Sequence, residues 1–300
     1  MLTFPQLTGF AILPMALLGA ICNWTAVHIL QKLPVFRHSF GYLSTSQAIA
    51  DAIHSTLFLI WFCPMVMCDI RLLKEYSRHC GFLLLFCYEL SVQTHLIISL
   101  NRFFAVWTPY KYNIWFSDRN TKIIIAILWT LTLLDAVALF EVLCNMYYDE
   151  TTGFFTFTAS PLCEAVSWYA DFCKYITSVI IIVIIDLTTI LKVRSLNKKV
   201  LPSIDHQSSS NRLSARQINF LKQTVFQGSV FALELLTYFL VPKYLSNPWA
   251  VFFGTSFAWV TVHAIDGVIL MAFNPEFLKF VMKRALNRHV SAGQTPYAVN

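Results

Sequence analysis

The recurrence of apolar segments long enough to cross a lipid bilayer most constrains what this chain can fold into. About 20 apolar residues in a helix, each rising ~1.5 Å, span a ~30 Å hydrocarbon core. Seven segments approach or exceed that length, at residues 7–30, 41–67, 81–100, 123–146, 175–191, 225–241 and 249–273. Only 13% of the 300 residues are charged, against roughly 25% in soluble domains. The sequence therefore predicts an all-α membrane protein, a seven-transmembrane helix bundle; six helices are the alternative if segment 225–241 is re-entrant.

The third apolar segment is the one expected to lie inside the bundle. Its polar and large side chains recur at three- and four-residue steps, which places them on one face of a helix. They are Leu84, Tyr88, Ser91, His95, Ile98 and Arg102. Because lipid satisfies no hydrogen-bonding group, this face must turn toward other helices.

The basic residues predict the orientation of the bundle. Seven helices put the termini on opposite sides, and the loops richer in Lys and Arg are cytoplasmic. One side holds fifteen such residues, at positions 32, 37, 111, 119, 122, 192, 194, 198, 199, 212, 216, 279, 283, 284 and 288, and the other holds five, at 71, 74, 78, 174 and 243. The N-terminus is therefore expected outside and the C-terminus in the cytoplasm. The net charge of +6 then reflects topology and attraction to anionic membrane lipid, so no nucleic-acid partner is expected.

The cytoplasmic end of the chain contains a helix start signal. Asn274 is a good N-cap, Pro275 suits the first helical position and Glu276 suits the first turn. Apolar and basic residues then oppose each other, which predicts a short amphipathic helix on the inner leaflet. The expected division is a membrane domain at residues 1–288 and a cytoplasmic tail at 289–300.

The cysteines predict a disulfide at the outer face and no metal site. The eight cysteines show no metal-binding spacing, so neither a structural metal nor a cofactor is expected. Cys80 stands at the outer end of the third helix and Cys163 in the longest outer loop, where an oxidising medium would preserve a bridge between them. Cys68, Cys144 and Cys173 lie near the same face and are the competing partners.

Four polar or aromatic residues mark the first four helices. Asn23, Asp51, Arg102 and Trp129 are separated by 28, 51 and 27 residues. This pattern resembles the helix landmarks of rhodopsin-like G-protein-coupled receptors. The end of the seventh helix, from Asp266 into Asn274-Pro275, resembles the Asn-Pro-x-x-Tyr region of that family and its following cytoplasmic helix.

A finer resemblance is to nematode chemoreceptor-like families, and among them to serpentine receptor class X. It covers roughly residues 10–288. The strings that carry it are Ser46-Gln47-Ala48-Ile49-Ala50-Asp51, Ile98-Ser99-Leu100-Asn101-Arg102-Phe103, Tyr110-Lys111-Tyr112, Phe116-Ser117, Asp266-Gly267 and Asn274-Pro275-Glu276-Phe277.

The sequence departs from the rhodopsin-like pattern at several positions. Asn101 replaces the acid that usually pairs with the arginine, and the start of the sixth helix offers no acid to Arg102. The seventh helix contains no lysine for a retinal Schiff base. Leu84 stands where amine receptors keep an acid, so an amine ligand is not expected.

The resemblance implies two sites in the interior. Arg102 is the expected contact for a heterotrimeric G protein at the cytoplasmic mouth. A polar cluster is expected near the middle of the membrane, either as a hydrogen-bond network that packs helices or as a site for sodium, because two adjacent carboxylates need a cation or a proton. The members of this cluster are Asn23, Asp51, Ser91, His263 and Asp266, with sodium bridging Asp51, Ser91 and Asp266.

The outer half of the bundle is the expected pocket for a small organic molecule, because aromatic side chains gather there with few polar groups. The candidate ligand-binding residues are Leu84, Tyr88, Glu89, Trp168, Phe172, Glu234, Tyr238 and Trp259. The resemblance implies a chemosensory receptor of the plasma membrane, including a sensory-neuron cilium, with a ligand, a G protein and membrane lipid as partners.

A second class of function is a secondary transporter or proton-coupled carrier, because buried Asp and His side chains can relay protons. Such a carrier would show helices broken at the midplane, and only Pro64 and Gly267 hint at breaks. An integral-membrane enzyme is not expected, since the chain contains no HExxH or GxSxG motif.

Overall fold

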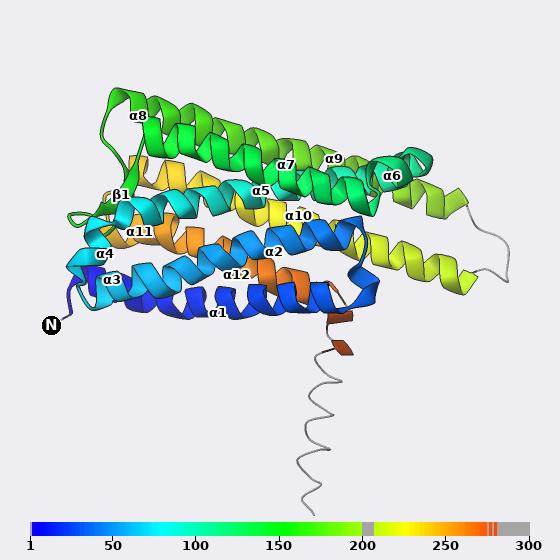
Figure 1. Ribbon diagram of the computed structural model, residues 1–300, viewed down its shortest axis with the longest axis horizontal. Coiled ribbons are helices and arrows are strands. Elements are labelled where there is room, and N and C mark those ends of the chain that lie inside the picture. Colours follow the sequence, from blue (N-terminus) through cyan, green and yellow to red (C-terminus); the bar gives the residue numbers. More distant parts are fainter. Residues whose placement is uncertain (1, 200–206, 275, 278, 281–300) are drawn as a thin grey trace, which may run out of the picture.

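The protein is an elongated bundle of seven helices that run along its long axis (Figure 1). The computed structural model describes residues 2–199, 207–274, 276–277 and 279–280. The seven membrane helices are α1 (Phe4–Lys32); α2, η2 and α3 (Ser39–Leu57, Phe58–Phe62, Cys63–Met67); α5 (Ser77–Trp107); α7 and η3 (Asp118–Ala136, Val137–Leu143); α8, η4 and α9 (Pro161–Ala165, Val166–Cys173, Lys174–Lys199); α10 (Gln207–Tyr244); and α11, η5 and α12 (Pro248–Phe252, Phe253–Phe257, Ala258–Ala272).

The prediction of seven spans is confirmed. Each of the seven helices is long and apolar enough to cross a membrane. The six-helix alternative is wrong, because the segment at 225–241 lies within one continuous helix, α10. The helix expected after Asn274 and the tail at 289–300 lie largely outside the described residues.

Short elements connect the membrane helices. They are η1 (Pro34–Phe36), α4 (Arg71–Glu75), α6 (Pro109–Trp115), and the antiparallel strands β1 (Met146–Asp149) and β2 (Phe154–Phe157). The hairpin, α4 and α8 gather at the end of the bundle that holds the N-terminus (Figure 1). We call this the N-terminal end and the other the opposite end.

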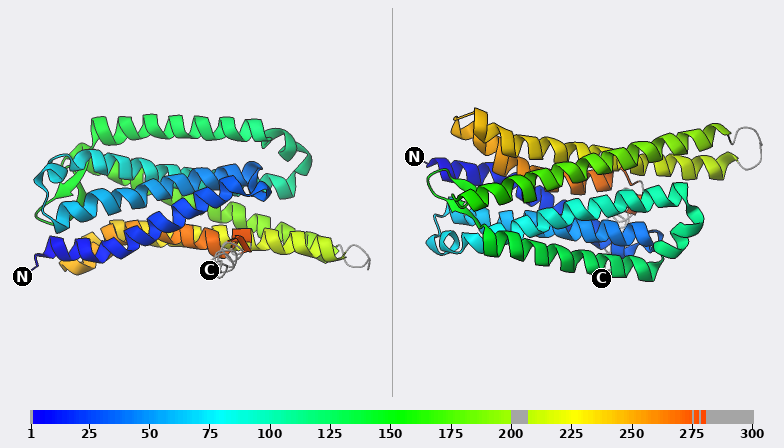
Figure 2. Two further views of the ribbon diagram at one scale, coloured as in Figure 1. Left: turned by 60° about the horizontal axis from the view of Figure 1, so that its bottom comes forward. Right: turned by 90° about the horizontal axis from the view of Figure 1, so that it is seen from above.

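The third membrane helix, α5, lies inside the bundle, as its sequence predicts. In its most apolar window 67% of residues are buried, against 17% in the α7–η3 span. In Figure 2, α7 runs along the outside of the bundle. Large apolar side chains stay exposed on α7 and α9, namely Ile127, Leu131, Leu134, Ile180, Ile184 and Leu187. An uncovered apolar surface of this extent suits contact with lipid acyl chains.

Four π-helical segments interrupt the membrane helices, and all four lie toward the N-terminal end: η2, η3, η4 and η5. Pro64 lies two residues after the end of η2, and its missing N–H removes one α-helical hydrogen bond there. A π-helical turn bonds residues i and i+5, so it rotates the following side chains relative to an α-helix. The π-helical segments therefore decide which side chains face the interior at this end.

The hairpin β1–β2 covers part of the N-terminal end. Gly153 makes its turn with a positive φ of 81°, a conformation that favours glycine, and Asp149 Oδ1 accepts a 2.9 Å hydrogen bond from the Thr151 N–H. Ser77 Oγ accepts a bond of 3.1 Å from the N–H of Tyr148, which ties β1 to α5. Burial, followed by the charges of Glu150 and nearby acids, raises the pKa of Tyr148 to about 12, so this ring packs against the bundle as a neutral phenol.

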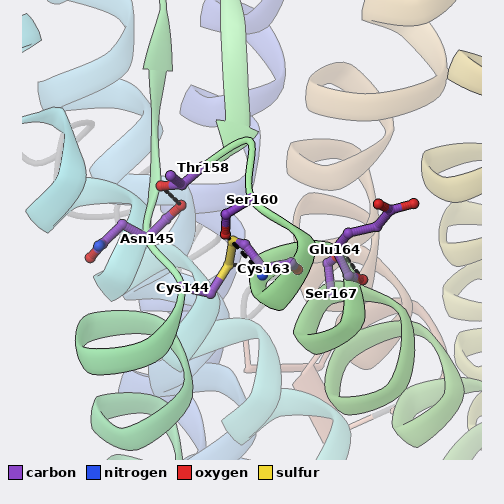
Figure 3. The surroundings of a disulfide bond; sticks show 7 residues. All are labelled: Cys144, Asn145, Thr158, Ser160, Cys163, Glu164 and Ser167. Atoms are coloured by element: carbon purple, nitrogen blue, oxygen red, sulfur yellow. Dashed lines mark hydrogen bonds between the residues drawn. A yellow bond between two sulfur atoms is a disulfide. The ribbon is translucent and has the colours of Figure 1, made fainter.

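The disulfide expected between Cys80 and Cys163 is wrong. Cys163 on α8 is bonded to Cys144 at the end of η3, while Cys80 is a buried free thiol on α5 (Figure 3). The hairpin brings the two ends together, because its register pairs Met146 with Phe157. The bridge therefore closes the short loop that holds the hairpin instead of joining that loop to α5.

A glycine allows a close contact between α1 and α12. A Cβ at Gly267 of α12 would stand 2.5 Å from Asn23 Oδ1 on α1, closer than real contacts allow. Asn23 Nδ2 in turn donates to the carbonyl oxygens of Gly19 and His263, at 3.0 and 2.9 Å. The small residue thus lets α1 and α12 approach until Asn23 bridges their backbones.

Candidate functional site

A small cavity lies between α5, η4, α10 and α12 toward the N-terminal end. It has a volume of about 20 Å³, which is room for about one water molecule. Five elements form its walls. They are α5 with Leu85 and Tyr88, β1 with Met146, η4 with Asp171, α10 with Glu234, Leu235, Tyr238 and Phe239, and α12 with Trp259. Tyr88 donates its hydroxyl proton to Glu234 Oε2 over 2.9 Å. The cavity is thus an aromatic pocket with buried carboxyl groups.

Four of the eight predicted ligand-binding residues line this cavity: Tyr88, Glu234, Tyr238 and Trp259. Leu84 is fully buried in the surrounding apolar core and does not reach the cavity.

Glu89 also lies outside the cavity wall. It follows Tyr88 by one residue, so it lies about 100° further around α5 and faces α7 and α9. There Lys174 Nζ lies 2.7 Å from Glu89 Oε1 and 2.9 Å from Asp135 Oδ2. Glu89 therefore belongs to an ion-pair group that links α5, α7 and α9.

Trp168 and Phe172 lie beside the cavity and not in its wall. Their rings stack at 4.7 Å, and Phe172 packs at 4.9 Å from Phe239, which does line the cavity. The Lys243 ammonium sits 4.0 Å from the centre of the Trp168 ring, a cation–π contact. Trp168 and Phe172 therefore pack against the outer side of the cavity wall.

Asp171 is the functional residue that sequence reasoning missed. Trp168 and Phe172 are four residues apart and would share a face of an α-helix, but η4 is π-helical. Its two buried residues are instead Val166 and Asp171, five apart, as the i to i+5 period requires. No sequence signal in this stretch identified the π-helical turn in advance.

The polar cluster expected near the middle of the bundle is assembled around Asp51. Ser91 Oγ donates to Asp51 Oδ1 over 2.8 Å, and His263 Nδ1 lies 2.7 Å from the same oxygen. Gln47 Nε2 donates to Asp266 Oδ2 at 3.3 Å. The cluster thus connects α2, α5 and α12 through buried hydrogen bonds.

The oxygen atoms of this cluster fit a sodium ion in part. Asp266 Oδ1 is buried without a hydrogen-bond partner among the described residues, and such an oxygen is a suitable ligand for a hard cation. Asp51 Oδ1, however, already accepts from Ser91 and contacts a ring nitrogen of His263. The described residues contain no group of three or more His, Cys, Asp or Glu arranged to hold a metal ion.

Arg102 lies buried on α5 toward the opposite end. Its guanidinium carbon is 4.8 Å from the centre of the Phe40 ring. Asp186 on α9 is an electrostatic neighbour of Arg102 and is itself fully buried. The start of the sixth helix offers no acid to Arg102, and the acid whose charge acts on Arg102 is Asp186 on the fifth membrane helix.

Asn101, which replaces the usual acid beside the arginine, forms a hydrogen bond to another helix. Its amide Nδ2 donates to Ser39 Oγ at 3.1 Å, and that hydroxyl lies 2.7 Å from Tyr112 OH. These bonds link α5 to the start of α2 and to α6. The substitution thus turns an ionic partner into a neutral helix contact.

A larger cavity of about 530 Å³ opens between α1, α2 and α7, near the opposite end. Leu30, Tyr42, Lys122 and Trp129 are in its wall, and Trp129 Nε1 donates to Ser46 Oγ at 2.9 Å. This cavity borders the exposed side of α7 and is separate from the Tyr88 cavity. It is a candidate contact for membrane lipid.

The fold is that of a rhodopsin-like seven-helix membrane bundle. Squid rhodopsin superposes with a TM-score of 0.77 at 14% identity, over 92% of this chain and 79% of rhodopsin. The sequence model of the family described as "Serpentine type 7TM GPCR chemoreceptor Srx" matches residues 13–274. The chain belongs to this family of serpentine chemoreceptors.

Two relatives from Caenorhabditis elegans agree with this assignment. Serpentine receptor class X 45 is 30% identical over 301 aligned positions, which cover 92% of this chain and 79% of the relative. Serpentine receptor class X-43 is 26% identical over 282 positions, with 92% and 83% covered. The resemblance to class X is thereby confirmed, and the protein is a multi-pass membrane protein of the G-protein-coupled receptor class.

Proposed function

We propose that this protein is a chemosensory receptor that binds a small molecule in the Tyr88 cavity and signals to a heterotrimeric G protein through the Arg102 end. One observation carries the proposal: α5 contributes both Tyr88 and Arg102. They are 14 residues apart, or about 21 Å along the helix. A buried helix with a ligand contact near one end and a cation near the other is suited to transmit a change across the membrane.

We propose further that the N-terminal end faces the medium outside the plasma membrane. The fifteen-to-five distribution of Lys and Arg favours this orientation. The Cys144–Cys163 bridge lies at the N-terminal end (Figures 1 and 3), and disulfides persist in oxidising compartments. In this orientation Arg102 is near the cytoplasm, where a G protein can reach it.

The Asp51 cluster is proposed to pack α2, α5 and α12 through hydrogen bonds. The alternative for the same residues is a sodium ion bridging Asp51, Ser91 and Asp266. Ligand-evoked signals measured in sodium and in potassium media decide between them. A sodium effect present in the wild type and absent in Asp51→Asn would favour the ion, and equal signals in both media would favour packing alone.

No observation favours a carrier. The membrane helices run unbroken through the middle of the bundle in the described residues, and α12 continues through Gly267.

The receptor function is tested in cells that express the full chain with a promiscuous G protein, challenged with a library of small organic compounds. We expect at least one compound to raise intracellular calcium in the wild type. Arg102→Ala should reach the surface at the same level and lose at least about 90% of the response, because removing a charge-assisted contact costs more than tenfold in affinity.

A second variant separates coupling from folding. Asp186→Asn removes the buried acid beside Arg102 at nearly constant volume, so it should raise ligand-independent signalling. Uptake of the active compound without any second-messenger signal would instead indicate a carrier and overturn the receptor function.

A further inference from the structure

Asp171 is a buried carboxyl group for which the described residues provide no hydrogen-bond partner. Its side chain belongs to η4, is 4% exposed and lines the cavity beside Glu234. Within the described part of the chain it takes part in no hydrogen bond or ion pair. A buried carboxylate without donors is costly, so the fold tolerates here a group that packing alone would not retain.

The basic residue Lys174 does not compensate the charge of Asp171. Lys174 acts on Asp171 electrostatically, but its ammonium is bonded to Glu89 and Asp135. Glu234, also 4% exposed, is a further acid in the cavity wall, and among the described residues its side chain accepts a hydrogen bond from Tyr88. The cavity thus combines two acids with no basic side chain in its wall.

We propose that the Tyr88 cavity binds the primary ammonium group of a small organic amine between Asp171 and Glu234. The proposal rests on the receptor function above and names its class of ligand. The aromatic rings of Tyr88, Tyr238 and Trp259 line the same space and add cation–π attraction. An amine ligand was not expected from the sequence, because Leu84 stands on the third helix where amine receptors keep an acid. The two acids of this cavity come instead from η4 and α10.

The size of the cavity narrows the ligand class. A volume of about 20 Å³ accepts a group about as large as one water molecule, which describes a primary ammonium group. A quaternary ammonium group is several times larger and would have to displace Phe239 or Trp259. Primary amines should therefore bind better than quaternary ones with the same alkyl chain.

The test uses the full-length protein in lipid nanodiscs and measures its thermal midpoint with n-alkylammonium ions from methyl to hexyl. The matched neutral probes are the 1-alkanols of the same lengths. At least one alkylammonium should raise the midpoint by about 5 °C near saturation, and its alcohol should not. Asp171→Asn and Glu234→Gln should each abolish most of the shift. Glu164→Gln removes an acid at the exposed surface of α8 and should keep it.

Two results would overturn the proposal. One is alkylammonium ions that stabilise the wild type no more than the alcohols do. The other is a shift of equal size in Asp171→Asn. The outcome is distinguishable from failure of the receptor function. A neutral compound that signals equally through wild type and Asp171→Asn would leave the receptor standing without the ammonium site. An ammonium-dependent shift without any signal would leave the site and remove the receptor function.

Discussion

Asp51 and Asp171 are both buried acids inside one bundle, but their surroundings differ. Asp51 on α2 is bonded to Ser91 and His263 at 2.8 and 2.7 Å, and these two neighbours come from two other helices, α5 and α12. Asp171 faces a cavity, and the described residues offer it no hydrogen bond. The difference distinguishes polar groups that hold the helices of a membrane bundle together from polar groups that can bind a ligand. An acid with donors from several helices holds them together, whereas an acid turned to a cavity is available to a molecule from outside.

The disulfide-closed hairpin β1–β2 near the Asp171 cavity offers the largest expected effect. Cys144→Ser removes the bridge that closes a loop with a sequence separation of 19, so unfolding should become easier by about 3 kcal/mol. Hydrogen exchange should then rise in η4 and the hairpin and stay unchanged around Asp51.

Cys80→Ala serves as the control for this variant, since Cys80 is a free thiol. It should leave the exchange of the hairpin unchanged. If Cys80→Ala released the hairpin and Cys144→Ser did not, the pairing with Cys163 would be wrong.

The neighbouring rings of His263 and His54 allow a matched break of the Asp51 cluster. Their centroids are 3.8 Å apart, and His54 has no hydrogen-bond partner among the described residues at either nitrogen. His263→Phe keeps a ring but removes a partner of Asp51, and should cost about 2 kcal/mol. His54→Phe replaces an unsatisfied ring by an apolar one and should cost nothing.

Denaturant or thermal unfolding in nanodiscs measures both substitutions. Equal losses for the two phenylalanine variants would show that ring packing, and not the bond to Asp51, holds α2 and α12 together.

Tyr88→Phe is expected to have the smallest effect on stability. It removes the 2.9 Å hydrogen bond to Glu234 and keeps the ring contacts, so the loss should be about 1 kcal/mol. Because Glu234 then loses its donor inside the cavity, alkylammonium binding should persist in this variant while it disappears in Glu234→Gln. Loss of binding in both variants would mean that the hydroxyl itself contacts the ligand.

The seven-helix fold and the interior position of α5 could be predicted because both follow from hydrophobic length and from the spacing of polar residues. The Asp51 cluster was predictable for a related reason: a carboxyl group within a membrane helix needs partners on other helices. Half of the pocket was predictable, since Tyr88, Glu234, Tyr238 and Trp259 lie on regular α-helices.

The remaining features depend on local geometry that hydrophobic patterns do not encode. Asp171 reaches the cavity because η4 is π-helical, and Glu89 misses it because it lies one residue around α5 from Tyr88. The partner of Cys163 is set by the hairpin register, which joins Cys144 to it. The electrostatic interaction of Asp186 with Arg102 depends on packing between α5 and α9, which come from distant parts of the chain.

The unfolding midpoints of Asp51→Leu and Asp171→Leu, measured side by side in nanodiscs without added ligand, test the central contrast most directly. Leucine has the same branching and number of side-chain heavy atoms as aspartate, although its volume is larger, and it carries no polar group. Asp51→Leu leaves the Ser91 hydroxyl and His263 without their acceptor, so its midpoint should fall by about 5 °C. Asp171→Leu removes an acid that makes no hydrogen bond among the described residues, so its midpoint should stay level or rise. A fall in Asp171→Leu as large as that in Asp51→Leu would contradict the account.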